Sequence, residues 1–137
     1  MEYPYFELPA GPEELIFKPI IPIRLSYRKT HKVTNFTLGA LLDTGADVCF
    51  CDDNIGAWLG VNPKGKKKHQ FTAANNQIFE TYRETITLHV GDMHYQCPFF
   101  FSNTLPKNSP LILGTKGFFD HFTVNFDLPK KLITIDT

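Results

Sequence analysis

The stretch that decides the fold is Ala40-Leu41-Leu42-Asp43-Thr44-Gly45-Ala46-Asp47-Val48-Cys49-Phe50-Cys51. Two apolar runs, each typical of a buried strand, flank the polar turn that begins at Asp43. An acid directly after three apolar residues needs a reason, because burying an unpaired carboxylate is costly. One reason is structural, an Asx turn that ends the strand. The other is chemical, because Thr44 supplies a hydroxyl, Gly45 lets backbone amides approach closely and Ala46 leaves the site uncrowded.

Outward from this turn, most of the chain has the composition of short strands. In residues 21–27 apolar and polar side chains alternate, which is the period of two expected of a half-buried strand. Turn residues separate such segments at regular spacing, which predicts an all-β domain closed as a barrel or packed as a sandwich. We expect strands at residues 21–27, 36–42, 48–51, 71–72, 77–90, 93–101, 111–114, 124–126 and 132–135.

Three segments are predicted to differ from strands. The pair Asp53-Asn54 is predicted to cap a short helix that ends at Gly60, and residues 117–122 are predicted to form one or two helical turns. Residues 1–15, which contain several prolines, are predicted to be an irregular N-terminal arm. The folded domain is therefore expected to span residues 16–137.

The composition is that of an ordinary globular domain. The chain has 137 residues, of which 42% are apolar and 20% charged, and these values favour a single packed domain over disorder. The 14 basic and 14 acidic residues leave no net charge to attract nucleic acid or an anionic membrane. We therefore expect neither as a partner, and we interpret the lysine-rich segment 64–68 as a solvated loop.

The N-terminus and the cysteines bear on the cellular compartment. Residues 1–5 contain an acid and a proline where a signal peptide needs positive charge followed by an apolar run, so we expect a soluble, cytoplasmic protein. Three cysteines are too few for a disulfide framework and favour a reducing compartment. Cys49 and Cys51 have no nearby His or second Cys pair, so we expect no metal site and interpret them as core residues.

Residues 41–47, Leu-Leu-Asp-Thr-Gly-Ala-Asp, resemble the active-site strand and turn of aspartic peptidases, particularly those of the single-domain retropepsin-like family. Residues 110–114, Pro-Leu-Ile-Leu-Gly, and the following residues 117–120 are similar to the late buried strand, glycine and short helix of that family. Residues 70–90 fall where the family has a flap hairpin that covers bound substrate. The resemblance covers residues 16–137 and implies a closed retropepsin-like β-barrel with one short helix, two copies forming the active enzyme.

Two features depart from the pattern of retroviral members. An Arg followed by Asp or Asn usually comes after the late glycine, whereas Thr115 and Lys116 stand there, so the salt bridge of that pattern is not expected. The proposed flap tip has no glycine, although Asn75 and Asn76 tolerate a positive φ better than most residues do.

Acid–base activation of a water molecule for attack on an amide needs two carboxylates that share one proton. The sequence contains one Asp-Thr-Gly turn and no second Asp-Thr-Gly or Asp-Ser-Gly. The simplest completion is a homodimer whose two-fold axis passes between two copies of Asp43. We therefore hypothesise an aspartic endopeptidase that acts on peptide or protein substrates through this pair, with no metal or organic cofactor.

The resemblance also implies roles for the neighbours of Asp43. Thr44 is expected to join the two active-site turns by hydrogen bonds, and Gly45 to contact the substrate backbone. The strand at residues 132–135 is expected to help form the dimer interface, its alternative interpretation being an ordinary edge strand. The active-site turn is completed by Thr44, Gly45 and Ala46, and the expected substrate-binding residues are Asp47, Ala74, Asn75 and Asn76.

A catalytically silent dimer that binds a peptide or a partner protein is the second hypothesis, because a fold does not guarantee an activity. The Thr115-Lys116 departure and the glycine-free flap favour it, whereas the intact Asp43 turn favours an enzyme. A glycosidase is disfavoured because no second acid is spaced onto a facing strand. An RNA-binding role for the lysine-rich segment is disfavoured further.

Overall fold

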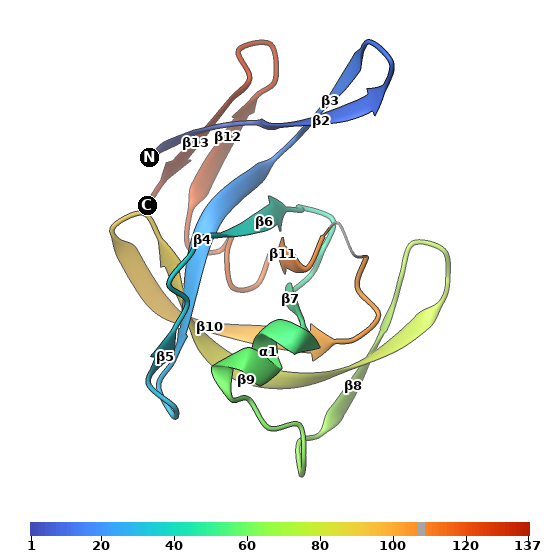
Figure 1. Ribbon diagram of the computed structural model, residues 1–137, viewed down its shortest axis with the longest axis vertical. Coiled ribbons are helices and arrows are strands. Elements are labelled where there is room, and N and C mark those ends of the chain that lie inside the picture. The colour runs from blue at the N-terminus through green and yellow to red at the C-terminus, as the bar shows by residue number, and fades with distance from the viewer. Residues whose placement is uncertain (107–108) are drawn as a thin grey trace.

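In the computed structural model, which describes residues 1–106 and 109–137, a barrel closes around β4 (Ile20–Tyr27), as Figure 1 shows. Ile21, Ile23 and Leu25 are buried in the core, and the residues between them are exposed, so the predicted alternation is confirmed. Residues 20–23 of this strand pair with β6 (Leu38–Leu42), and residues 24–26 pair with β9 (Ile78–Val90). Because β4 joins strands from both ends of the sheet, the sheet closes on itself.

The remaining strands complete the ring. From β6 it continues through β11 (Leu111–Leu113), β7 (Cys49–Asp52) and β10 (Met93–Ser102) to β9 and back to β4. The short β5 (Lys32–Val33) extends β4, and β8 (Lys68–Thr72) extends β9 as a hairpin. β11 runs parallel to β6 and antiparallel to β7. The expected all-β barrel is therefore confirmed.

The barrel interior is filled by aliphatic and phenylalanine side chains. Cys49 and Cys51 are fully buried among them, which confirms their interpretation as core residues, and Cys97 is fully buried as well. The largest fully buried side chains are Phe99, Phe101, Phe118, Ile21, Ile23, Leu25, Leu59, Ile86, Leu88, Leu111, Leu113 and Ile133.

The short helix α1 (Asp53–Leu59) covers one end of the barrel, and it is the one α-helix in the described ranges. Its N-cap is Asp52 and not the predicted Asp53-Asn54 pair, because the Asp52 carboxylate accepts a hydrogen bond from the Asn54 N–H at 2.8 Å. The predicted stop at Gly60 is confirmed, since this residue adopts φ +88°, a conformation that favours glycine.

Residues 117–122 form a hydrogen-bonded turn where one or two helical turns were predicted. Phe122 N–H donates to the Phe118 carbonyl at 3.2 Å, and this is the kind of bond that one helical turn contains. Gly117 precedes the turn with φ +108°, and the Asp120 carboxylate accepts a hydrogen bond from its N–H at 3.0 Å. Phe119 N–H donates to the Gly114 carbonyl at 3.2 Å and Asp120 N–H to the Thr115 carbonyl at 3.1 Å, which ties the segment to the preceding loop.

The N-terminal segment is strand and not irregular. β1 (Glu2–Pro4) pairs with β13 (Leu132–Asp136), which also pairs with β12 (Thr123–Asp127), so β13 is the central strand of a three-stranded sheet and not an edge strand. β2 (Phe6–Gly11) and β3 (Glu14–Lys18) form a hairpin. The prolines of this segment interrupt the strand pattern, so the sequence did not predict its strands. The domain boundary at residue 16 stays a prediction.

Glu84 on β9 ties the lysine-rich segment to the barrel. Its carboxylate, 12% exposed, accepts hydrogen bonds from the Tyr27 hydroxyl at 2.7 Å and from Lys66 Nζ at 2.8 Å. The segment 64–68 is thus solvated as predicted at Lys64 and Lys67 but anchored at Lys66. Burial opposes the charge on Glu84, but the hydrogen bonds from Lys66, Tyr27 and the Thr85 N–H lower the pKa of Glu84 to about 2.

The described part of the chain contains no helix that is long and apolar enough to span a membrane.

We predict that Glu84→Gln lowers the free energy of unfolding by about 2 kcal/mol near neutral pH. A glutamate in the unfolded chain has a pKa of about 4.3, above the folded value, so the stabilisation is complete above that pH and is lost as the pH falls toward 2. Urea unfolding across this range measures the effect, with exposed Glu80→Gln on the same strand as the control. A deficit that stays the same at every pH would contradict the assignment.

Candidate active site

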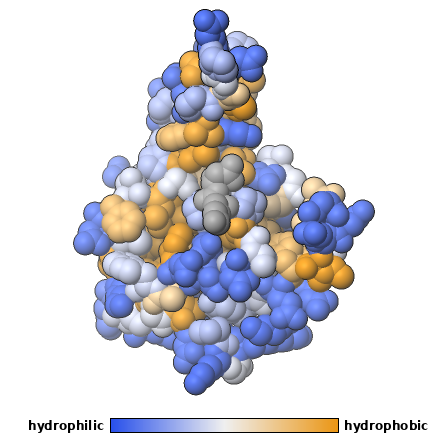
Figure 2. All heavy atoms as spheres, turned by 45° about the vertical axis from the view of Figure 1, so that its right-hand side comes forward, coloured by the Kyte–Doolittle hydropathy of each residue, from blue (hydrophilic) through white to orange (hydrophobic). Residues whose placement is uncertain are grey.

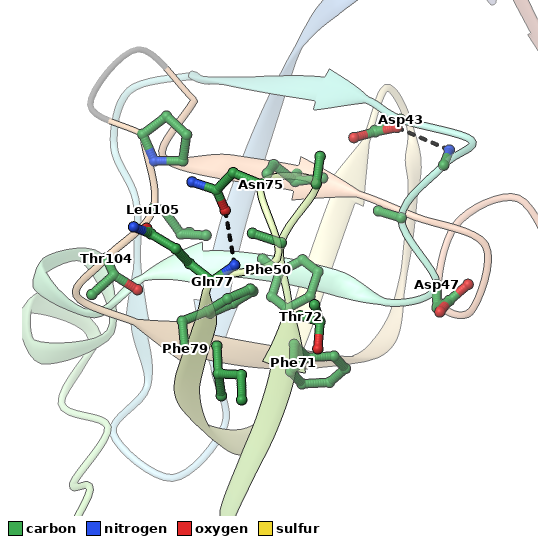
Figure 3. Close-up of a pocket in the computed structure, with 17 residues that line it drawn as sticks. Asp43, Asp47, Phe50, Phe71, Thr72, Asn75, Gln77, Phe79, Thr104 and Leu105 are labelled. Carbon is green, nitrogen blue, oxygen red and sulfur yellow. Dashed lines mark hydrogen bonds between the residues drawn. The ribbon is translucent and has the colours of Figure 1, made fainter.

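The turn between β6 and β7 lies at the edge of a cavity of about 510 Å³ (Figure 3). Asp43, Gly45, Ala46 and Asp47 line one side of this cavity. The β8–β9 hairpin lines the opposite side, and the loop after β10 contributes Thr104, Leu105 and Pro106. The cavity is therefore lined by both the predicted active-site turn and the predicted flap.

Asp43 is held at the end of β6 by three hydrogen bonds. Its N–H donates to the Leu113 carbonyl at 3.0 Å, and its own carbonyl accepts from the Ala46 N–H at 3.1 Å. Its carboxylate Oδ1 accepts from the Gly45 N–H at 2.9 Å, so the Asx turn is present. A Cβ on residue 45 would lie 3.2 Å from that oxygen, which explains why glycine suits the position. The half-buried carboxylate faces the cavity.

The loop after β11 holds the Asp43 turn in place through backbone hydrogen bonds. Thr115 N–H donates to the Ala46 carbonyl and Lys116 N–H donates to the Asp47 carbonyl, both at 2.9 Å. At Gly114 the two segments are so close that a Cβ would lie 2.2 Å from the Val48 oxygen and 2.6 Å from the Ala46 oxygen. This support is independent of the side chains at positions 115 and 116.

Two thiols fill the space below this loop. Cys49 Sγ accepts a hydrogen bond from the Gly114 N–H at 3.4 Å, and Cys97 Sγ donates to the Gly117 carbonyl at 3.5 Å. The hydrogen bond with Cys49 and burial both raise the pKa of Cys97, so this thiol stays protonated. It therefore serves in packing and not as a nucleophile.

The tip of the β8–β9 hairpin closes without glycine. Asn76 adopts φ +65°, as its side-chain type permits, and its N–H donates to the Ala73 carbonyl at 2.9 Å. The Asn75 carboxamide oxygen accepts from the Gln77 N–H at 3.1 Å (Figure 3). A defined turn over the cavity is thus built from asparagines.

Aromatic side chains form the apolar part of the cavity wall. Phe50 packs against Phe71 at 5.0 Å and against Phe79 at 5.6 Å between ring centroids, and Phe71 lies opposite Phe79 across the hairpin. Sequence reasoning missed this surface, because its members come from two separate segments of the chain. The available signal was a phenylalanine on each of the two hairpin strands, flanking the flap tip.

The structure brings together six of the eight predicted site residues. The cavity is lined by Asp43, Gly45, Ala46, Asp47, Ala74 and Asn75. Thr44 and Asn76 are exposed, and neither lines the cavity. Within residues 1–106 and 109–137, no three His, Cys, Asp or Glu side chains gather closely enough to hold a metal ion.

Comparison with known proteins identifies the fold of this chain. No model of a protein family matches this sequence, and no curated protein matches it. Among solved structures, the chain is similar to a retropepsin-like aspartic protease from Rickettsia conorii, with 15% identity, 97% of each chain covered and a TM-score of 0.62. It is also similar to EIAV protease complexed with the inhibitor HBY-793, with 20% identity, 78% of this chain and 88% of that chain covered and a TM-score of 0.49. The first similarity shows that this chain has the retropepsin-like fold, as its sequence predicted.

We predict that Gly114→Ala destabilises the fold by about 3 kcal/mol, because the added methyl group would collide with two backbone carbonyls that cannot move independently. Urea unfolding measures the loss. The control is Gly39→Ala on β6, where a Cβ meets one movable side-chain methyl of Ile20 at 3.0 Å and the cost is expected to stay below about 1 kcal/mol. Equal effects of the two substitutions would show that the close approach at residue 114 is not what holds the turn.

Proposed function

We propose that this chain, which has the retropepsin-like fold, is an aspartic endopeptidase that acts as a homodimer. The observation that carries the proposal is the Asp43 carboxylate, held by backbone hydrogen bonds at the edge of a covered cavity. A carboxylate fixed in this way is ready for acid–base work, because its orientation does not have to be created during the reaction.

A second copy is needed to complete the chemistry. Asp47 also borders the cavity, but Figure 3 shows its carboxylate directed away from that of Asp43, so the two do not form a pair within one chain. A two-fold axis beside the turn would bring Asp43 to face the partner's Asp43. Thr44, which is exposed, would then meet its own counterpart and join the two turns.

In the proposed reaction the pair holds one proton between its two carboxylates. The ionised carboxylate removes a proton from a water molecule as the water oxygen attacks the peptide carbonyl carbon. The protonated carboxylate gives its proton to the carbonyl oxygen, which yields a neutral tetrahedral intermediate. The carboxyl group that took the water proton then protonates the leaving nitrogen. The other carboxylate, now ionised, takes a proton from one hydroxyl as the C–N bond breaks, which forms the carboxylic acid product and restores the single shared proton.

The cavity walls support binding of an extended peptide. Gly45 and Asp47 lie where they can contact a peptide backbone, and Ala74 and Asn75 would cover it from the hairpin. The wall formed by Phe50, Phe71 and Phe79 would bury an apolar side chain of the substrate.

We predict that Asp43→Asn abolishes turnover, by at least about a thousandfold, while the fold and the dimer remain. The amide cannot act as a base, but its oxygen can still accept the Gly45 N–H, and repulsion between the two carboxylates is removed. Peptide cleavage, melting temperature and sedimentation measure the three properties, and exposed Asp92→Asn is the matched control. Full activity in Asp43→Asn would exclude the proposed role, and a silent wild-type chain that binds peptide would favour the binding hypothesis.

Mixtures of wild-type and Asp43→Asn chains test whether the site is shared. Each heterodimer contains half of the pair and is expected to be inactive, so activity should fall with the square of the wild-type fraction when subunits exchange freely. A linear fall would mean that each chain works alone.

We predict a bell-shaped pH profile of activity with its optimum on the acidic side of neutral, because activity requires one proton on the pair. Initial rates of peptide cleavage measure the profile. Circular dichroism at the same pH values separates loss of chemistry from unfolding, which becomes easier below about pH 4.3 as the stabilisation from ionised Glu84 is lost. A rate that keeps rising into the alkaline range would contradict a carboxylate pair.

A further inference from the structure

The β2–β3 hairpin has no strand neighbour outside itself in the described part of the chain. Its two strands form a separate two-stranded sheet, whereas the other strands belong to larger sheets. A two-stranded hairpin is marginally stable in water unless a further surface packs against it. A further surface packed against the hairpin would therefore add to its stability.

One face of the hairpin is apolar and exposed. Phe6 pairs with Lys18 and Leu8 pairs with Ile16, and residues directly opposite on antiparallel strands share a face. Phe6, Leu8 and Ile16 therefore form one stripe, in which Phe6 is 49% and Ile16 44% exposed and Leu8 is half-buried. Lys18 lies on the same face beside Phe6. We call this stripe the hairpin face.

The opposite side of the hairpin contacts its own chain at Phe17, whereas Leu15 on that same side is 56% exposed. Phe17, which lies on that side, stacks beneath Lys131 Nζ at 4.6 Å from the ring centroid. Lys131 belongs to the turn between β12 and β13, and its carbonyl also accepts from the Tyr5 N–H at 3.1 Å. Because Phe17 faces these contacts, the hairpin face is directed away from them.

The hairpin emerges beside the candidate active site. β3 ends at Lys18, and the carbonyl of the next residue, Pro19, accepts a hydrogen bond from the N–H of Leu42, the residue before Asp43. Figure 1 shows the hairpin projecting from the barrel on the same side of β4 as the turn after β6, and Figure 2 shows apolar side chains on the projecting lobe. A second copy that faces the Asp43 turn is therefore within reach of this lobe, which at six residues of β2 is about 20 Å long.

We propose that the hairpin face, Phe6, Leu8 and Ile16, packs against the second copy in the homodimer. The inference rests on the proposed function for the presence of that copy, and it assigns a surface that the shared-carboxylate mechanism does not specify. Under two-fold symmetry each hairpin contacts its partner in the same way, so both apolar stripes become buried in one assembly. The hairpin then acts as an arm that keeps the two Asp43 turns together.

The test is the double variant Phe6→Ser and Ile16→Ser. We expect its dimer dissociation constant, measured by sedimentation, to rise at least about tenfold, because large anchors carry most of the energy of an interface. The matched control is Val33→Ser with Phe36→Ser, which removes two apolar side chains of similar exposure, 44% and 58%, from β5 and the loop after it. Circular dichroism verifies that both variants fold.

Hydrogen exchange on the wild-type chain gives a second readout, which needs no substitution and so does not depend on whether a variant folds. Amides of β2 and β3 are expected to gain protection as the concentration rises through the dissociation constant, whereas amides of the distant loop at residues 64–68 should not change. A dimer whose hairpin amides show no such dependence would overturn the inference.

The outcomes separate this inference from the proposed function. A wild-type dimer that is active, and whose affinity is unchanged by the hairpin variant, would overturn the arm and leave the shared site standing. A wild-type chain that cleaves peptides as a strict monomer would overturn both. A wild-type chain that dimerises through the hairpin but cleaves no peptide would support the arm and count against the peptidase.

Discussion

The backbone of Gly114 lies so close to the backbone of residues 46–48 that a single added carbon would overlap two carbonyl oxygens. This approach sets β11 directly under the turn that carries Asp43, and the N–H groups of Thr115 and Lys116 then reach their carbonyl partners. The direction of the Asp43 carboxylate is thus set by main-chain atoms. Because backbone atoms hold the turn, the side chains at positions 115 and 116 can vary without changing its geometry. The turn therefore keeps its hydrogen bonds although Thr115 and Lys116 depart from the pattern of retroviral members.

Closure of the barrel places the Asp43 turn where the proposed dimer could complete the site. β4 pairs with both β6 and β9, so the barrel wall closes on itself. The Asp43 turn borders the cavity beside this wall, and Thr44 is exposed. A second copy could place its own Asp43 turn against this one, and two-fold symmetry is the simplest arrangement that does so.

The sequence revealed those parts of the molecule that depend on local patterns. Period-two alternation located β4, and the residues around Asp43 located the turn, because each signal lies within a few neighbouring positions. The strands of the N-terminal segment were missed because prolines interrupt the pattern and because β1 finds its partner at the far end of the chain. The aromatic cavity wall was missed for a related reason, since Phe50 meets Phe71 only after the barrel has closed.

The parallel pairing of β6 with β11 also affects when the Asp43 turn can form during synthesis of the chain. Asp43 N–H is bonded to the Leu113 carbonyl, about 70 positions later in the chain, and such distant contacts form late in folding. While a ribosome is still translating the middle of the chain, the turn has no support beneath it. The order of synthesis itself therefore keeps the Asp43 geometry from assembling until the segment around Leu113 has been made.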